Sequence, residues 1–109
     1  MAKTMRPWTK IHDAIEATAV SGPIDCRGYN ALAAYVTFSA TQNWTLAILG
    51  SMSVDGPFLP VLVNGTALSK QTNASGLLLF TNIPDYIQLQ ATEDVNGAAV
   101  TVWVAPCTL

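Results

Sequence analysis

The sequence predicts an all-β protein, an antiparallel β-sandwich of about eight short strands with either a jelly-roll or an immunoglobulin-like arrangement. Three observations support this class. Apolar side chains alternate with polar or small ones along several segments, which is the period of a strand with one buried face. Turn-forming residues recur about every 8–12 residues, as in sandwiches and barrels. No segment has a convincing helical period, and 109 residues give room for one domain.

Residues 1–12 are expected to form an extended N-terminal arm, and residues 13–109 a single β-sandwich domain. The arm shows no apolar period, and Pro7 has no backbone N–H to donate to a helix or a sheet. Frayed ends are common in small domains, but Trp8 favours an arm that docks, because a free tail would leave its large apolar area in water. Three of the five basic residues lie in this segment: Lys3, Arg6 and Lys10.

The first part of the domain is predicted to be extended. Residues 11–20 predict a strand, or a short helical turn followed by a strand, which ends at the turn-forming residues 21–23. Residues 24–26 predict a short extended piece, and residues 27–30 predict the turn that follows it.

Two segments with clean alternation come next. Residues 32–38 and 44–49 each have a period of two and flank a break at residues 41–43, so they are predicted to pair as an antiparallel hairpin. Residues 50–57 predict a loop, and its Asp-Gly-Pro sequence predicts a turn.

The strands predicted after this loop are shorter. Residues 58–63 predict a strand at a sheet edge, because Pro60 cannot donate to a central ladder. An Asn-Gly turn separates it from a strand predicted within residues 66–71. Residues 77–80 predict an apolar strand, which residues 82–85 terminate.

The last two predicted strands cover residues 86–91 and 98–105. Residues 93–97 between them contain an Asn-Gly pair, which favours the positive φ of tight hairpins. Pro106 is predicted to end the second strand. The residues predicted to face the core across all strands are Leu32, Val36, Phe38, Leu46, Ile48, Ile87, Leu89, Val100 and Val102.

No catalytic constellation can be assembled from the sequence, and the protein is predicted not to be an enzyme. His12 is the single histidine, and on a strand the adjacent Asp13 side chain would point to the opposite face. A Ser-His-Asp arrangement needs such groups aligned with one another. No phosphate-binding glycine motif and no zinc-ligand spacing occurs, so no cofactor, metal or small-molecule substrate is expected.

Cys26 and Cys107 are predicted to be buried thiols, which behave as small apolar side chains. A disulfide between them would need the first and last strands to be neighbours, and synthesis in a cytoplasm disfavours it. The N-terminal residues lack the apolar core of a signal peptide. The protein is therefore expected to be made in a cytoplasm.

The low charge of the chain indicates surface that is covered in an assembly. Only 11% of the residues are charged and 50% are hydrophobic, whereas soluble domains average about 25% charged residues. A domain of this size hides only about 60–70% of the surface of its unfolded chain. The net charge of −2 gives no broad positive field for nucleic acid, and no apolar run reaches the roughly 20 residues of a membrane span. Other protein chains are the expected partners.

Tyr35 and Trp103 are predicted to lie on the outside of the sandwich, because the alternation places them opposite the core-facing residues. Exposed aromatic rings can stack on sugars, which gives a carbohydrate-binding module as an alternative function. Aromatic residues are also enriched in protein interfaces, and the low charge favours that interpretation.

Residues 24–106 carry an ordered series of turn and strand landmarks. They are Ile-Asp-Cys-Arg-Gly-Tyr at 24–29, Gly-Ser at 50–51, Asp-Gly at 55–56 before Phe58, a Ser-Gly-apolar strand at 75–80, Pro-Asp-Tyr-Ile at 84–87 and Gly-Ala-Ala-Val-Thr-Val at 97–102. In this order they resemble small β-sandwich virion proteins of tailed bacteriophages. None of the landmarks is a catalytic motif, and the N-terminal arm has no counterpart among them.

The resemblance implies a structural role on the exterior of a virion: a capsid decoration or cement protein that binds the shell and bridges its subunits, or another head or tail component. Such proteins typically form symmetric clusters, often trimers, and bind the major capsid protein where its subunits meet. The resemblance therefore implies that this chain is made in the host cytoplasm and forms a homo-oligomer, with a trimer favoured. A self-assembling shell or filament would suit the same composition. From composition alone, the arm is predicted to clamp the partner through Lys3, Arg6, Pro7, Trp8 and Lys10.

Overall fold

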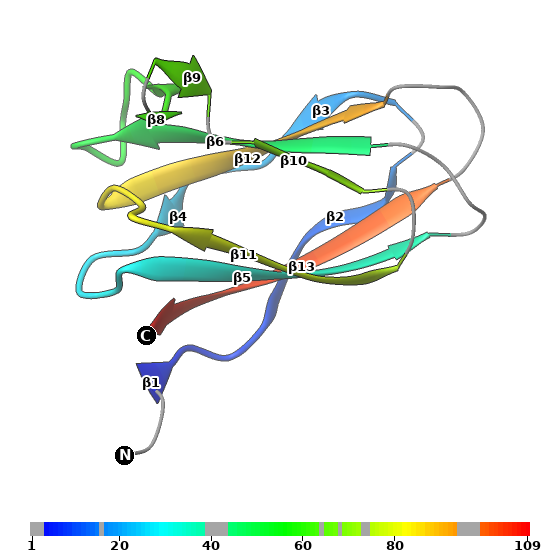
Figure 1. Ribbon diagram of the computed structural model, residues 1–109, viewed down its shortest axis with the longest axis horizontal. Helices are drawn as coiled ribbons and strands as arrows, with labels where there is room; N and C mark the ends of the chain where they lie inside the picture. Colours follow the sequence, from blue (N-terminus) through cyan, green and yellow to red (C-terminus); the bar gives the residue numbers. More distant parts are fainter. Residues whose placement is uncertain are drawn as a thin grey trace.

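The computed structural model describes residues 4–15, 17–38, 44–63, 65–67, 69–72, 75–93 and 99–109. These residues form two antiparallel sheets packed face to face, with no helix among them (Figure 1). The predicted all-β sandwich is confirmed. A small separate ribbon, β8 (Leu62–Val63) and β9 (Thr66–Ala67), turns through Gly65, whose φ is 80°.

The first sheet, sheet A, has β13 at its centre. Its strands are β1 (Thr4–Met5), β2 (Thr9–Ile15), β5 (Ala31–Phe38), β11 (Gly76–Thr81) and β13 (Val100–Thr108). On one side β13 pairs with β5, and β11 follows β5 at the far edge. On its other side β13 pairs with β2 and, near its end, with β1.

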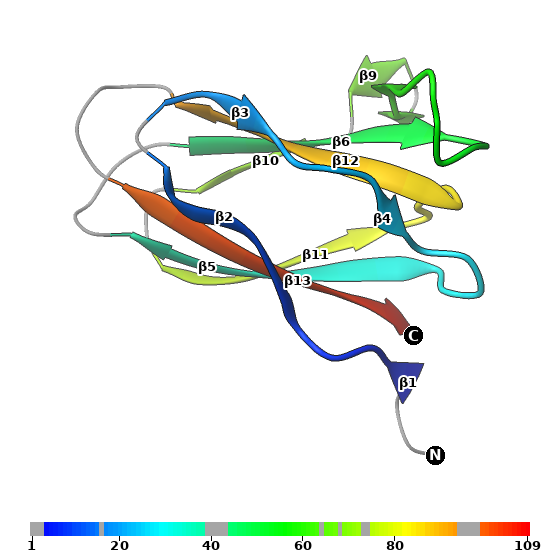
Figure 2. The ribbon, with the colours of Figure 1, turned by 180° about the vertical axis from the view of Figure 1, so that it is seen from behind.

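The second sheet, sheet B, has β6 and β12 at its centre. Its strands are β3 (Ala19–Val20), β4 (Ile24–Asp25), β6 (Trp44–Ser51), β7 (Leu59–Pro60), β10 (Ser69–Thr72) and β12 (Tyr86–Glu93). β10 and β7 pair with successive parts of β6, and β3 and β4 pair with successive parts of β12. Figure 2 shows β2, β3 and β4 together on the back of the sandwich.

The strand order is that of a jelly roll. When the interrupted edge β3–β4 is counted as one strand and the short β1 and β7 to β9 are set aside, eight strands remain. Their order is first, eighth, third and sixth in sheet A, and second, seventh, fourth and fifth in sheet B. The jelly roll is thus the one of the two expected arrangements that is observed.

The hairpins indicated by the sequence are wrong, because the connections cross between the sheets. β5 and β6 were the predicted pair at 32–38 and 44–49, yet they belong to sheets A and B respectively. β12 and β13 are likewise in opposite sheets, and the Asn-Gly turn expected between them lies outside the described residues. Alternation reports which side of a strand is buried but not which strand lies beside it.

Part of the N-terminal segment pairs as a strand of sheet A. β2 begins at Thr9, so residues 9–12 of the expected arm are paired with β13. Two register shifts interrupt this ladder, and Ala14 has a positive φ of 50°. Such bulges disturb the period of two, which is why the sequence pattern indicates neither the start of β2 at Thr9 nor its end at Ile15. The single strand expected over 11–20 is wrong, because β2 and β3 lie in different sheets.

Pro106 does not end the last strand, which continues to Thr108. Its carbonyl oxygen accepts a hydrogen bond from the backbone N–H of Arg6 at 3.0 Å. The N and the C=O of a strand residue point to the same neighbour, so the missing N–H of the proline faces the short stretch between β1 and β2, where no ladder runs. Proline is tolerated in strands at such breaks.

The core between the sheets closely follows the prediction. Eight of the nine predicted residues are at most 1% exposed, and Phe38 is partly buried against them. Three further large side chains complete the core: Trp44, Phe80 and Val104. Cys26 and Cys107 are buried free thiols, as predicted.

Candidate interaction surface

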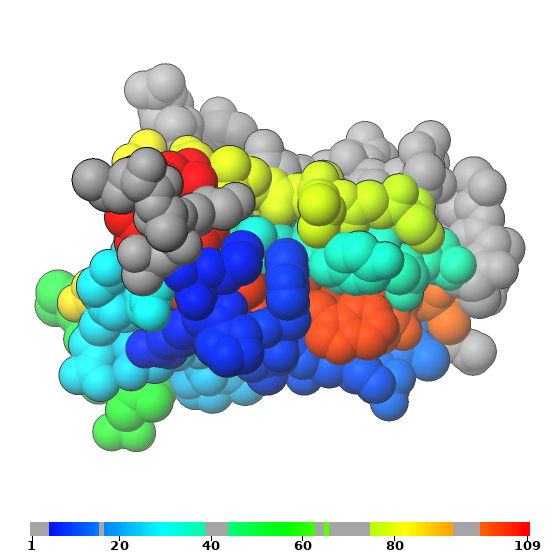
Figure 3. All heavy atoms as spheres, turned by 90° about the horizontal axis from the view of Figure 1, so that it is seen from below, coloured from blue at the N-terminus to red at the C-terminus, as the bar shows by residue number. Residues whose placement is uncertain are grey.

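A row of large side chains crosses the outer face of sheet A. In the sheet register Lys10 lies opposite Trp103, Trp103 lies opposite Tyr35, and Tyr35 lies opposite Leu77. Directly opposite residues of antiparallel strands point to the same face. The four side chains, called the aromatic row below, therefore run across β2, β13, β5 and β11. Figure 3 shows this face, with the four strands as adjacent blue, orange, teal and yellow-green bands.

The rings of this face are packed against one another. The Tyr35 and Trp103 ring centroids are 5.8 Å apart at an interplanar angle of 69°, and those of Trp8 and Tyr35 are 6.3 Å apart at the same angle. These are edge-to-face contacts, a favourable geometry for aromatic pairs. The ammonium of Lys10 lies 5.4 Å from the centroid of the Trp103 ring, within cation–π range.

This packed surface is nevertheless open to solvent. Trp8 is 42% exposed, Tyr35 is 45% exposed and Leu77 is 67% exposed. Together with Trp103 they line a shallow hollow of about 390 Å³. Leu79 on the same edge strand is 41% exposed. Contiguous exposed apolar surface of this kind marks interaction sites in soluble proteins.

The two aromatic residues singled out by the sequence, Tyr35 and Trp103, are thus brought into contact on the outer face. Trp8 and Lys10 of the expected clamp join them there. The sequence did not indicate Leu77 as part of this surface, because its segment reads as a wholly apolar strand. The pairing of β11 with β5 is what places it beside Tyr35.

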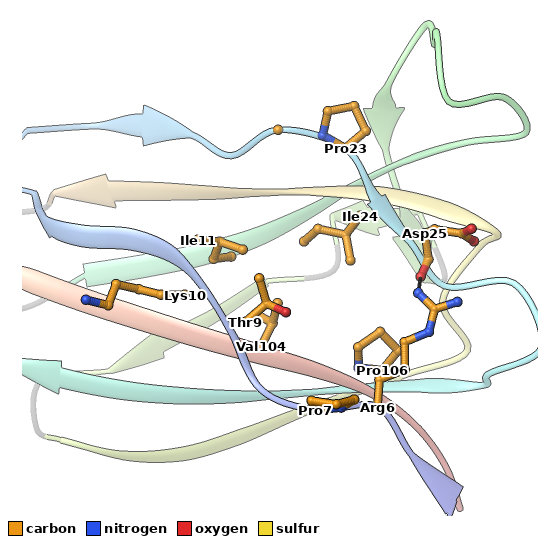
Figure 4. A pocket seen from close by; sticks show the side chains of 11 residues that line it. Arg6, Pro7, Thr9, Lys10, Ile11, Pro23, Ile24, Asp25, Val104 and Pro106 are labelled. Atoms are coloured by element: carbon orange, nitrogen blue, oxygen red, sulfur yellow. Dashed lines mark hydrogen bonds between the residues drawn. The ribbon is translucent and has the colours of Figure 1, made fainter.

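The other residues of the expected clamp lie elsewhere. The guanidinium of Arg6 donates to the backbone carbonyl of Asp25 on β4 and lies 5.1 Å from the centroid of the Tyr29 ring. Arg6 and Pro7 line a groove of about 410 Å³ between β2 and the β3–β4 edge (Figure 4). Lys3 lies outside the described residues.

Asp25 is held by a second arginine. Its carboxylate accepts hydrogen bonds from the Arg27 side chain at 2.8 and 3.1 Å and from the Arg27 backbone N–H at 3.0 Å. These hydrogen bonds lower the pKa of Asp25 to about 2. The guanidinium of Arg27 also lies 5.3 Å from the centroid of the Tyr86 ring. The ion pair between Asp25 and Arg27 holds the turn that follows β4.

His12 links the two sheets inside the sandwich. Its side chain is buried, and Nε2 lies 3.1 Å from the carbonyl oxygen of Leu89 on β12. A carbonyl oxygen only accepts, so Nε2 carries the proton. The backbone N–H of Leu89 donates to Oγ of the buried Ser21 at 2.9 Å, and the N–H of Ser21 donates to the same carbonyl at 3.0 Å. These hydrogen bonds satisfy the backbone groups of Leu89, which lies between the parts of β12 that pair with β3 and β4.

The described residues offer few groups for metal binding or nucleophilic chemistry. No three His, Cys, Asp or Glu side chains gather there closely enough to hold a metal ion. Burial raises the pKa of the Cys26 thiol to about 12, which keeps it protonated and a poor nucleophile at neutral pH. The part of the chain that is described also contains no helix long and apolar enough to cross a membrane.

The chain is similar along its whole length to a solved structure. That structure is the crystal structure of the SPBc2 prophage-derived protein YomS, with a TM-score of 0.67, 11% sequence identity, and coverage of 99% of this chain and 96% of that chain. No protein-family model and no curated protein sequence matches. The chain therefore shares its fold with a phage-related protein.

Proposed function

We propose that this protein is a non-enzymatic structural component of a phage virion, which attaches to the exterior of the shell and bridges neighbouring capsid subunits. The observation that carries the proposal is the aromatic row with Trp8 beside it, a packed but open apolar surface on the outer face of sheet A. The low charge of the chain and its fold similarity to a prophage-derived protein support it.

The proposed mechanism is the burial of this face against the major capsid protein. Three properties suit the surface to the task. Large aromatic rings are frequent anchors in interfaces. The edge-to-face contacts of Tyr35 with both tryptophans hold the rings in place before binding, so little side-chain entropy is lost on attachment. Lys10 at one end of the row supplies a positive charge, and its ion pair with Asp13 (3.6 Å) is exposed and weak enough to be exchanged for a partner's carboxylate.

Many copies on one particle would reinforce one another. An interface of standard size covers about 800 Å² on each partner, and apolar burial contributes about 25 cal/mol per Å² before the costs of association. When copies also contact each other on the shell, detachment of one requires breaking both kinds of contact, so avidity exceeds the affinity of a single copy.

Co-sedimentation of the purified chain with capsids that lack it tests the proposal. The double variant Tyr35→Ala/Trp103→Ala is expected to lose at least 10-fold in apparent affinity, because two central anchors are removed. The matched control is Met52→Ala, which changes a side chain that is 94% exposed in the loop after β6. Binding of both variants equal to that of the unchanged chain contradicts attachment through this face.

A carbohydrate-binding module is the second candidate, supported by the hollow that three aromatic residues and Leu77 line. A sugar ring there would stack on Trp8 or Trp103 and change their fluorescence. Titration with capsule and cell-wall polysaccharides is expected to alter the emission of the unchanged chain and not that of the double variant Trp8→Ala/Trp103→Ala. No change with any polysaccharide removes this candidate.

A further inference from the structure

The far edge of sheet A, strand β11, is unusual among the described sheet edges. β11 pairs with β5 on one side, and no described strand pairs with its other side. A free edge exposes unpaired N–H and C=O groups that can template the pairing of another chain. Native proteins usually block such edges with charged residues, prolines, bulges or very short strands.

Each other described edge carries one of these features. β2 is bulged and contains Lys10 and Asp13, and β7 contains Pro60. The remaining edges are short: β10 has four residues, and β1, β3, β4, β8 and β9 have two each. β11 spans six residues, Gly-Leu-Leu-Leu-Phe-Thr, with no charge, no proline and an uninterrupted register to β5. It is therefore the described edge that is ready for pairing.

The hydrogen-bond pattern identifies the groups at this free edge. The N–H of Asn82 donates to the carbonyl oxygen of Asn30, toward the β5 side, at 3.0 Å. Backbone groups alternate along a strand, so those of Phe80 and the other even-numbered residues of β11 face β5. The N–H and C=O groups of Leu77, Leu79 and Thr81 consequently face outward from the sheet edge.

We infer that β11 pairs antiparallel with β11 of a second copy of this chain, across a two-fold axis through Leu79. In this register Leu79 lies opposite its own counterpart and Leu77 opposite Thr81, so all three outward-facing residues are paired and form about six backbone hydrogen bonds. The exposed Leu77 and Leu79 side chains of both copies would gather into one apolar cluster on the outer face.

Three arguments favour a second copy over another extended chain. An antiparallel strand is its own complement across a two-fold axis, so one sequence satisfies both sides. Residues 76–81 carry no charge, so no like charges meet at the axis. The pairing also joins two A sheets into one continuous sheet with both aromatic rows on the same side. This inference does not depend on attachment to a shell.

The mass of the chain in solution over a dilution series tests the pairing, by light scattering or sedimentation. The unchanged chain is expected at twice its monomer mass of 11.6 kDa. Leu79→Pro removes the central N–H and is expected to weaken dimerisation at least 10-fold. Leu79→Lys keeps that N–H but places like charges opposite one another, which is also destabilising. Leu62→Lys, at a side chain 61% exposed on β8, is the control and should remain dimeric.

Hydrogen exchange gives a readout of the edge itself. The amides of Leu77, Leu79 and Thr81 are expected to be protected at high protein concentration and to exchange rapidly once dilution gives monomers. A monomer at every concentration overturns the inference. So does a mass of three copies, since antiparallel self-pairing closes at two, or a dimer that both Leu79 variants leave unchanged. Circular dichroism of each variant separates lost pairing from lost folding.

Discussion

Tyr35 is the centre of the candidate surface, since its ring contacts both Trp8 and Trp103. Because the two rings are in contact, Tyr35 and Trp103 are expected to be energetically coupled in the free protein. The perturbation that isolates the coupling is a double-mutant cycle of Tyr35→Ala, Trp103→Ala and the variant with both changes. Subtracting the effects of the two single substitutions from that of the double substitution leaves the interaction free energy between the two rings.

The expected magnitude follows from the geometry. A centroid distance of 5.8 Å and an angle of 69° lie within the range of favourable edge-to-face pairs, which contribute about 0.5–1.5 kcal/mol beyond the apolar area they bury. We therefore expect a coupling free energy of about 1 kcal/mol. A cycle between Tyr35→Ala in sheet A and Met52→Ala in the loop after β6 of sheet B should be additive within about 0.5 kcal/mol.

Urea unfolding followed by circular dichroism measures these quantities, and equal slopes across the four proteins show that the unfolded states are comparable. A Tyr35–Trp103 coupling below about 0.3 kcal/mol would refute the reasoning. The rings would then be independent in the free protein, and the surface would not be organised before a partner binds.

Three further predictions concern the framework that holds this surface. Ser21→Ala should lower the free energy of unfolding by about 1–3 kcal/mol, because it leaves the buried backbone N–H of Leu89 without an acceptor. The control is Ser53→Ala, at an exposed serine that also accepts from a backbone N–H. In the same urea assay it should cost under about 0.5 kcal/mol. Gly50→Ala should destabilise by roughly 1–3 kcal/mol in thermal unfolding, because the added Cβ would overlap Cγ of Pro84 and lie 2.9 Å from Cγ2 of Val61. An unchanged melting temperature would show that these contacts relax freely. Folding raises the pKa of Cys26 from 9.0 to about 12, so the unfolded chain loses this proton at lower pH than the folded protein. The free energy of unfolding should therefore fall between pH 9 and 12, with no contribution from Cys26 below pH 9. Cys26→Ala should reduce this dependence on pH.

The alternation of apolar residues predicted the buried faces well, because burial of a strand face is a local property of the sequence. Leu32, Val36, Leu46 and Val102 are fully buried as expected. The same logic placed Tyr35 on the outside. Strand neighbours are not local, since each is set by a connection that can stay in one sheet or cross to the other. The expected hairpins failed for this reason.

The N-terminal segment shows a second limit. Its pairing with β13 depends on bulges that spoil the alternation and on contacts nearly 90 residues away, such as the hydrogen bond from the Ala14 N–H to Oγ1 of Thr101. Arg6 was expected beside Trp8 in one clamp, yet it points to the Asp25 carbonyl at the opposite side of the segment. Composition indicated that the residues were available for contacts but not which surfaces they reach.

The most direct test of the proposed attachment is hydroxyl-radical footprinting of this chain on purified virions, compared with the free protein. Attachment through the outer face of sheet A predicts that oxidation of Trp8 and Trp103 falls on the virion. Met52, which is 94% exposed away from that face, should remain reactive and serves as the internal reference. Equal oxidation of the two tryptophans in both states, or absence of the chain from the particles, would contradict the account.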